Sequence, residues 1–217
     1  MSLFLEPQSL AFTDELTDAA VRLLATTGVP RLSLGLVAAG MGMSRQGLTQ
    51  RLKTELEAAR HESAPAAYLH EIVAGRFGTR FCAWSTDGLF DDGTGRPPRL
   101  AVPVTEEERT GTRIWHTLRE IARADRADGE TGPARALAMT NHGLRRETRT
   151  ALERWSGRRL SLAEVCAILA LVDGVHIAAS APIAPIAPIA PAIARKILDD
   201  AILALAARAA GDSAPAA

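Results

Sequence analysis

Cysteine, aromatic residues and net charge are all scarce in this sequence. Its 217 residues include two cysteines, 4% aromatic residues and a formal net charge of +0. Cys82 and Cys166 stand far apart without CxxC spacing, so we expect no disulfide and no metal site. The balance of charges excludes a chain that is basic all over, so any affinity for a polyanion must come from a local patch.

The common enzyme motifs are absent as well. The chain has no Walker loop, no GxSxG and no HExxH, and its five histidines are scattered. Asp173 and His176 stand three residues apart and could pair on one helix face, but a satisfied polar pair in a core is a simpler interpretation than catalysis. We therefore predict no catalytic residues, no cofactor and no enzymatic activity.

Long uninterrupted apolar runs are missing too. The most apolar stretch, LAEVCAILALVDGVHIAAS from Leu162, contains Glu164 and Asp173 and is followed by prolines. It predicts a well-covered helix instead of a membrane span. Met1 to Phe12 has no basic leader followed by an apolar run, so we expect no signal peptide and a cytoplasmic protein without a membrane partner.

What the sequence does contain is helical periodicity, which predicts an all-α protein. A chain of 217 residues can bury a substantial core, and one small plus one larger helical domain is the natural division. Caps and apolar spacing predict helices from Thr13, Ser33 and Ser44, over 54–62, 66–83, 105–124 and 133–155, from Ser161, and over 193–209. Before the last helix, Ala-Pro-Ile repeats three times from Ala181. The repeat predicts a stiff polyproline II connector or, alternatively, a docking segment for an aromatic-lined partner.

The segment from Ser33 to Lys53 predicts two short helices joined by a tight turn. Ser33 can cap the first helix with its hydroxyl, and Ser44 can cap the second in the same way. Gly42 lies between them, and glycine accepts the left-handed backbone that such a turn requires. From Arg31 to Lys53 every charge is positive, as expected of a segment that approaches a polyanion.

The second of these helices has two different faces. Leu48 and Leu52, four residues apart, form a stripe that we expect to be buried. The outer face carries side chains of the kinds that contact base edges, followed by two that can reach phosphates. These candidates are Arg45, Gln46, Thr49 and Gln50 for the bases, and Arg51 and Lys53 for the phosphates. An ordinary helical pair with a solvated face is the alternative interpretation.

The first sixty or so residues resemble the DNA-binding domain of TetR-type transcriptional regulators. The resemblance is carried by LTDAAVRLLATTGVPRLSLGLVAAGMGMSRQGLTQRL. It matches in order through the glycine that ends the first helix, Ser33, Val37-Ala38, the run Gly42 to Arg45, and Leu48. The two apolar helices near the C-terminus also resemble the closing pair of helices in that family.

The resemblance implies a three-helix helix-turn-helix DNA-binding domain over 1–60 and a helical effector-binding and dimerisation domain over 61–217. Ser33 and Ser44 would contact phosphates, Arg45 and Gln46 would face bases, and Lys53 would lie near the DNA backbone. The implied partners are a palindromic double-stranded operator, an unknown small-molecule effector and a second copy of the chain. The implied function is that of a ligand-responsive regulator, most simply a repressor.

Two further sets of residues are candidates for the effector and dimer sites. The effector pocket would lie among the central helices, and ordinary core packing is the alternative for its lining residues. Those residues are Trp84, Trp115, His116, Trp155 and His176. The dimer interface would use the two apolar C-terminal helices, at Val165, Leu169, Val172, Ile197, Ala201 and Leu205.

Four positions depart from the family's pattern, namely Gly47, Thr49, Leu52 and Glu55. Glycine is a poor helix former by up to about 1 kcal/mol, and the other three replace residues that usually contact phosphate. The departures favour a second interpretation: a ligand-binding or protein-interaction module of the same fold with weakened or lost DNA binding.

Overall fold

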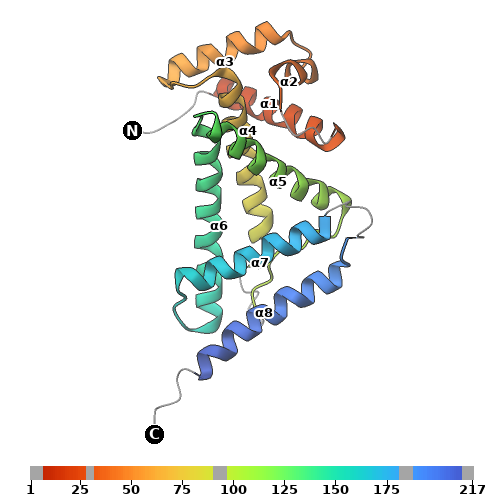
Figure 1. The fold of residues 1–217 in the computed structure, drawn as a ribbon, viewed down its shortest axis with the longest axis vertical. Coiled ribbons are helices and arrows are strands. Elements are labelled where there is room, and N and C mark those ends of the chain that lie inside the picture. The colour runs from red at the N-terminus through yellow and green to blue at the C-terminus, as the bar shows by residue number, and fades with distance from the viewer. Residues whose placement is uncertain (1–6, 28–31, 90–96, 181–187, 212–217) are drawn as a thin grey trace. The chain divides into compact units, whose positions relative to one another are not determined.

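The computed structural model describes residues 7–27, 32–89, 97–180 and 188–211, with side chains described from residue 11 to residue 204 within those ranges. These residues form eight helices and no strands, which confirms the all-α prediction. The helices are α1 (Pro7–Thr27), α2 (Leu34–Gly40), α3 (Arg45–Ala59), α4 (Pro65–Thr86), α5 (Glu106–Ala127), α6 (Gly132–Ser156), α7 (Leu162–Ser180) and α8 (Pro191–Gly211) (Figure 1). Most of the Ala-Pro-Ile repeat, residues 181–187, lies outside the described residues.

The helices are divided between two compact units. The first contains α1 to α3, α4 as far as Phe81, α5 from Ile114, and α6 as far as Thr140. The second contains the remaining parts of α4, α5 and α6 together with α7 and α8. The chain therefore crosses from one unit to the other within three continuous helices.

The first helix begins earlier than the sequence pattern predicts. A start at Thr13 is wrong, because α1 begins at Pro7. Phe12 is 2% exposed and extends the buried face of Leu16 back by one turn, so the apolar stripe does not begin after Thr13. Thr13 is itself buried, and its hydroxyl accepts a hydrogen bond from the Arg76 guanidinium at 3.1 Å.

The third helix is longer than predicted. A separate helix starting at Thr54 is wrong, because α3 runs without a break to Ala59. The Thr54 hydroxyl donates to the Gln50 carbonyl at 3.1 Å instead of capping a new helix. Leu56 is buried and continues the stripe of Leu48 and Leu52, so burial favours one continuous helix.

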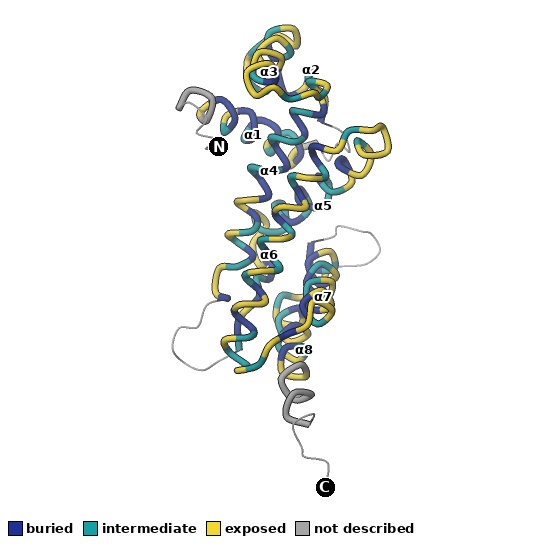
Figure 2. Tube along the Cα trace, turned by 90° about the vertical axis from the view of Figure 1, so that its left-hand side faces the viewer, coloured by how far each residue is buried: buried dark blue, intermediate teal, exposed yellow. Residues whose placement is uncertain are grey.

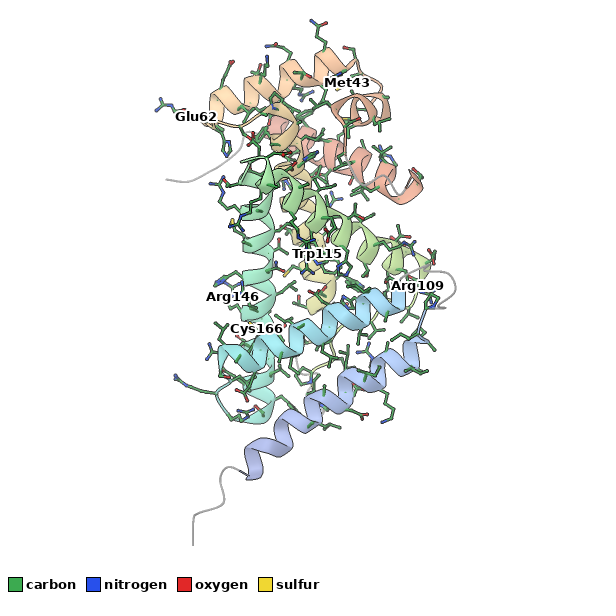
Figure 3. The ribbon with its side chains drawn as sticks, in the orientation of Figure 1. Met43, Glu62, Arg109, Trp115, Arg146 and Cys166 are labelled. Carbon is green, nitrogen blue, oxygen red and sulfur yellow. The ribbon has the colours of Figure 1, made fainter. Side chains whose placement is uncertain are left out.

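The core of the first unit joins its three N-terminal helices to α4 and α5. Leu16 of α1, Val37 of α2 and Leu52 of α3 have no exposed surface. On α5, Trp115 is 1% exposed and stacks on Phe81 of α4 with ring centroids 4.8 Å apart. Figure 3 shows Trp115 on α5. The stacked pair joins α4 to α5 within the first unit.

The second unit packs α7 against α8 around a core of leucine, isoleucine and valine. Leu152, Leu160, Leu198 and Ile202 are at most 1% exposed. Figure 2 shows that both α7 and α8 also carry exposed residues. Each of these helices therefore has one face in the core of its own unit and another that this unit leaves open.

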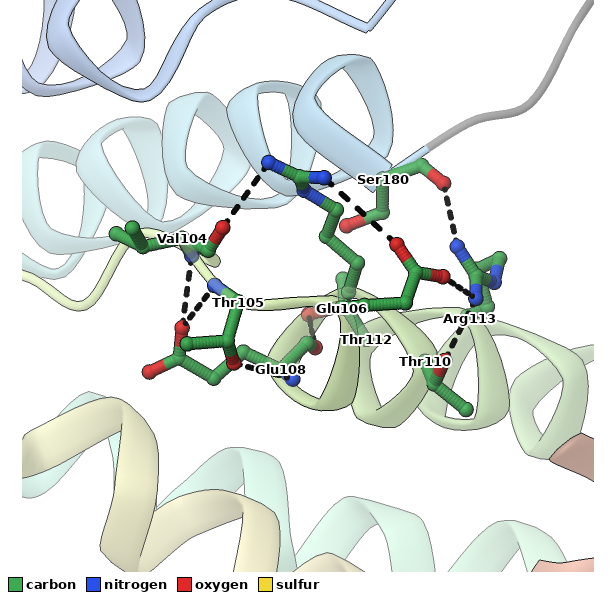
Figure 4. Close-up of polar contacts among 9 residues, drawn as sticks. Val104, Thr105, Glu106, Glu108, Thr110, Thr112, Arg113 and Ser180 are labelled. Carbon is green, nitrogen blue, oxygen red and sulfur yellow. Dashed lines mark hydrogen bonds and ion pairs between the residues drawn. The ribbon is translucent and has the colours of Figure 1, made fainter.

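Capping boxes begin two helices of the second unit. At α5 the Thr105 hydroxyl accepts from the Glu108 amide, while the Glu108 carboxylate accepts from the Thr105 and Val104 amides (Figure 4). Burial raises the pKa of Glu108, but these hydrogen bonds outweigh it and leave the pKa below its usual value. At α7, Arg158 and Ser161 hydrogen-bond to Glu164 and lower its pKa to about 2.

α7 is long and apolar enough to cross a membrane by length and composition alone. Core helices of globular proteins meet the same criteria. Its Val165, Ile168, Val172 and Val175 lie in the core of the second unit.

Candidate nucleic-acid interface

Two serine-capped helices and a glycine turn form the predicted helix-turn-helix. The Ser33 hydroxyl accepts from the Leu36 amide at 3.2 Å at the start of α2, and the Ser44 hydroxyl accepts from the Gly47 amide at 3.0 Å at the start of α3. Between them Gly42 has a φ of 69°, which glycine adopts without strain. Figure 3 shows Met43 in this turn. The local structure predicted for residues 33–44 is present.

The surface of α3 opposite its buried stripe is polar. Gln46, Gln50 and Lys53 are exposed and recur at helical spacing, whereas Leu48 and Leu52 are buried. Fifteen residues make α3 about 22 Å long at 1.5 Å per residue. An exposed polar helix of this length suits a major groove about 12 Å wide.

Three other candidates have more local roles. Arg45 is exposed at the first position of α3. Thr49 is half-buried, and its hydroxyl donates to the Arg45 carbonyl at 2.8 Å. The guanidinium carbon of Arg51 lies 3.8 Å from the centre of the Phe12 ring, so this cation packs against α1. Arg51 is exposed like Gln46, Gln50 and Lys53, but its guanidinium lies over the Phe12 ring of α1.

The extension of α3 brings acidic residues onto the same helix. Glu57 is exposed four residues after Lys53, and Glu55 is half-buried. A carboxylate near a phosphate backbone is repelled, so the basic segment ends at Lys53 instead of covering the whole helix. The prediction of a new helix at Thr54 concealed this, because it assigned Glu57 to a different element.

Residues far apart in sequence hold the helix-turn-helix against α5. His70 of α4 is buried, and its Nδ1 lies 2.6 Å from Asp125 Oδ2 while its Nε2 lies 2.8 Å from the Leu32 carbonyl oxygen. Farther along, the Ser63 hydroxyl and Ala64 amide donate to the Glu130 carboxylate at 3.1 and 3.3 Å. Sequence reasoning missed both links. A polar His70 on the apolar side of a helix was the available signal.

A cleft opens beside the His70 link. Its volume is about 410 Å³. Its walls come from the start of α2, from Arg45 of α3, from α4 and from the end of α5. Arg45 therefore lies on the same cleft as His70, Asp125 and Asp128.

The candidate effector residues fall into two groups. Trp84 and His176 meet in the second unit, with ring centroids 5.5 Å apart. Trp155 is half-buried against the core of that unit. Trp115 and His116 belong to the first unit, where Trp115 is part of the core. The described contacts therefore bring together Trp84 and His176.

Trp84 and His176 have further polar contacts. The Trp84 indole N–H donates to Glu108 Oε1 at 3.3 Å, and His176 Nε2 donates to the Ala101 carbonyl at 2.8 Å. Burial lowers the pKa of His176, although the Ala101 carbonyl and the charge of Asp173 act in the opposite direction.

The residues predicted for the dimer interface differ in their exposure. Val165 and Val172 lie in the core of the second unit, and Leu169 and Ala201 are half-buried against that core. Ile197 is 38% exposed. The side chain of Leu205 lies outside the described residues. Other positions form the open face of α7 and α8, namely Cys166, Ala170, Gly174, Ile177, Ile193 and Ile197.

A scan against protein-family models and a search of curated proteins give no match. Among solved structures, the chain is similar to one assigned to the TetR-family transcriptional regulators, from Rhodococcus sp., with a TM-score of 0.63 and 19% identity. That alignment covers 89% of this chain and 98% of the other. A regulator from Streptomyces coelicolor A3(2) aligns at a TM-score of 0.48 and 16% identity, over 87% of this chain and 96% of that one. The predicted resemblance is therefore confirmed for the fold: this chain folds as the TetR-family protein from Rhodococcus does.

Proposed function

We propose that this chain is a transcriptional regulator that binds a near-palindromic DNA operator as a homodimer and is released by a small-molecule effector. The observation that carries the proposal is the exposed polar face of α3, held by a serine-capped helix-turn-helix. The fold shared with a TetR-family protein supports it. In this proposal residues 1–60 form the DNA-binding domain and residues 61–217 the effector-binding and dimerisation domain.

The side chains of α3 suit direct reading of bases in the major groove. Gln46 and Gln50 can each form two hydrogen bonds with adenine, and Arg45 can do so with guanine. Ser33 and Ser44 lie at helix N-termini, and each hydroxyl retains a hydrogen to donate to a phosphate. Lys53 adds a phosphate contact. We assign Arg51 to the packing of α3 on α1, because its guanidinium covers the Phe12 ring.

The dimer would form through the open face of α7 and α8. Ile177 and Ile193 are 47% and 56% exposed, and the exposed small residues Cys166, Ala170 and Gly174 allow close approach of another helix. A two-fold dimer presents two copies of α3 to one side of the duplex, and binding requires them to lie about 34–36 Å apart. An effector would act by favouring a different spacing, which requires unequal affinity for the two states.

Paired substitutions on α3 test the DNA-binding assignment. Gln46→Ala with Gln50→Ala removes two base contacts per subunit, and each is worth about 1–3 kcal/mol, so affinity for a selected duplex falls at least tenfold. Arg154→Ala, an exposed arginine on α6, is the matched control and leaves affinity unchanged. Equal affinity for the double variant and the control would contradict the assignment, provided that both proteins remain folded and dimeric.

Charged substitutions on the open face test the dimer assignment. Ile177→Glu with Ile197→Glu places carboxylates on α7 and α8 and yields monomers in sedimentation at micromolar concentration. Met139→Glu, at a residue 72% exposed in the first unit, keeps the wild-type mass. A double variant that remains dimeric excludes this face as the interface.

A second candidate function has support in α3 itself. Glu57 shares the exposed side of α3 with the candidate base contacts, Glu55 follows Lys53 closely, and Arg51 is directed to Phe12. These features favour a module that binds a ligand or another protein without reading DNA. The two functions differ in salt dependence, because a DNA-reading dimer loses affinity steeply as salt rises and a module without DNA contacts shows no such binding.

A further inference from the structure

The buried imidazole of His70 lies between two hydrogen-bond acceptors. Its Nε2 is 2.8 Å from the carbonyl oxygen of Leu32, which accepts hydrogen bonds and has no hydrogen to donate. Its Nδ1 is 2.6 Å from Oδ2 of Asp125, which as a carboxylate also accepts. A neutral imidazole carries one N–H, whereas the charged form carries two. Donation to both acceptors therefore requires a protonated ring.

The location of Asp125 favours that charge. Asp125 lies in the last turn of α5, where the helix dipole is negative and an unpaired carboxylate is unfavourable. A cation at this point neutralises the carboxylate and the end of the helix together. Both groups are shielded, with side chains 10% and 17% exposed, so the pair is screened less by salt than a surface pair would be.

We propose that His70 is a positioning residue for the DNA-binding surface: its protonated ring fastens the start of α2 to α5, and loss of one proton releases that fastening. The proposal rests on the function proposed above and names a form of regulation for the same site. When the ring becomes neutral, the carboxylate holds the remaining N–H. The other nitrogen then presents a lone pair to the Leu32 carbonyl, so the Leu32 contact is lost.

The released bond acts on the helix-turn-helix directly. Leu32 immediately precedes the cap residue Ser33, so the His70 contact lies at the start of α2. Leu32, Ser33 and Arg45 line the cleft beside His70, so α2 and the first residue of α3 share that boundary. We therefore expect deprotonation to loosen α2 and displace Arg45 from its base-contacting position.

The other charges facing His70 across this cleft are few. Arg45 of α3 and Asp128, the residue that follows α5, line it together with Asp125, and the lining residues from α2 and α4 add no other titratable side chain. Arg45 opposes a charged ring and Asp128 favours it. The direct 2.6 Å contact with Asp125 outweighs both, because Coulomb energies fall with distance.

Two substitutions distinguish the effect of the charge on the His70 ring from the effect of the ring itself. Asp125→Asn keeps both hydrogen bonds with a neutral ring, because the asparagine amide donates to Nδ1 and Nε2–H still donates to Leu32. In this variant the hydrogen bond from His70 to the Leu32 carbonyl no longer depends on pH. His70→Ala removes both bonds at every pH. His142→Ala removes an exposed histidine on α6 and serves as the control.

The first measurement needs no DNA. Long-range ¹⁵N NMR of the full-length protein at about pH 6 is expected to show two protonated ring nitrogens on His70. Hydrogen exchange, corrected for intrinsic rates, is expected to show that the α2 amides are roughly tenfold less protected at about pH 8 than at about pH 6. The Asp125→Asn protein shows constant protection over the same range, and His142→Ala behaves as the wild type. A singly protonated ring at about pH 6, or pH-dependent protection in Asp125→Asn, overturns the proposal. Neither reading requires the His70→Ala protein to fold.

The second measurement distinguishes this proposal from the proposed function. Affinity for a selected duplex falls roughly tenfold between about pH 6 and pH 8 in the wild type, and this added pH dependence disappears in Asp125→Asn. DNA binding with equal pH dependence in both proteins overturns the fastening and leaves the regulator intact. No DNA binding, with the NMR and exchange results as stated, overturns the regulator and leaves the fastening of α2 established.

Discussion

A histidine is buried in each of the two units, and the two differ in what surrounds the ring. His70 is 8% exposed and faces a carboxylate and a carbonyl, so its hydrogen bonds require a charged ring. His176 is 1% exposed and donates to the Ala101 carbonyl, and its burial lowers its pKa. Burial alone does not decide the charge of a histidine. For His176 burial outweighs the single acceptor Ala101, whereas His70 lies between two acceptors.

The difference extends to the role of each unit. In the first unit polar contacts such as His70 with Asp125 join elements across the helix-turn-helix. In the second unit α7 packs on α8 around an apolar core, polar contacts such as His176 with Ala101 join other elements, and an open face of small and apolar residues remains. In the function proposed above, the first unit carries the polar binding surface and the second carries the dimer interface.

The largest expected effect comes from removing a core leucine in either unit. Leu52→Ala in the first unit and Leu198→Ala in the second each lower the free energy of unfolding by about 2–5 kcal/mol, because both side chains are buried. Hydrogen exchange should show the greater loss of protection in the unit that carries the change. Leu36→Ala, 45% exposed on α2, is the control, with a much smaller effect. Equal loss in both units for both core variants would show that they unfold as one.

A smaller change in stability is expected when either of two helical glycines, one in each unit, is replaced by alanine. A Cβ at Gly78 would lie 2.4 Å from Thr140 Oγ1, whereas a Cβ at Gly111 meets nothing within 4 Å. Gly78→Ala should destabilise by about 1–3 kcal/mol, and Gly111→Ala should stabilise by up to about 1 kcal/mol through helix propensity. Both are measured by urea unfolding. Adding Thr140→Ala to Gly78→Ala should recover stability, and a failure to recover it would exclude this clash as the cause.

The smallest effect concerns the charge of His176. Burial lowers its pKa below the ordinary value of 6.5, so the unfolded chain binds more protons than the folded one as pH falls. The stability due to the neutral ring is therefore present above about pH 6.5 and is lost below it. His176→Gln keeps a donor for Ala101 and should flatten unfolding free energy measured between pH 7 and pH 5. An unchanged pH profile would contradict the neutral assignment.

Much of the fold follows from local sequence signals. The serines at 33 and 44 cap helices as predicted, and the helix predicted over 105–124 is present as α5, with Thr105 in its cap. The helix boundaries that the sequence pattern predicted wrongly depend on the burial of side chains. Phe12 and Leu56 continue apolar stripes past the residues that looked like caps, and tertiary packing of those side chains overrides the capping pattern.

The candidate interface was only partly predictable for a related reason. Exposure of Gln46, Gln50 and Lys53 follows from helical period, since each lies opposite a buried leucine. The direction of Arg51 depends on Phe12, and the His70 contact joins residues 55 positions apart. No periodicity within one helix specifies such partners, because they are brought together by the packing of α1, α4 and α5.

Selection of random-sequence duplexes on the purified protein tests the central claim most directly. If α3 reads DNA from a two-fold dimer, the enriched sequences contain an inverted repeat with half-sites one helical turn, or a multiple of it, apart. Their binding weakens steeply between low and moderate salt. A folded, dimeric protein that enriches no sequence would contradict the claim and leave the ligand-binding or protein-interaction module as the account of this chain.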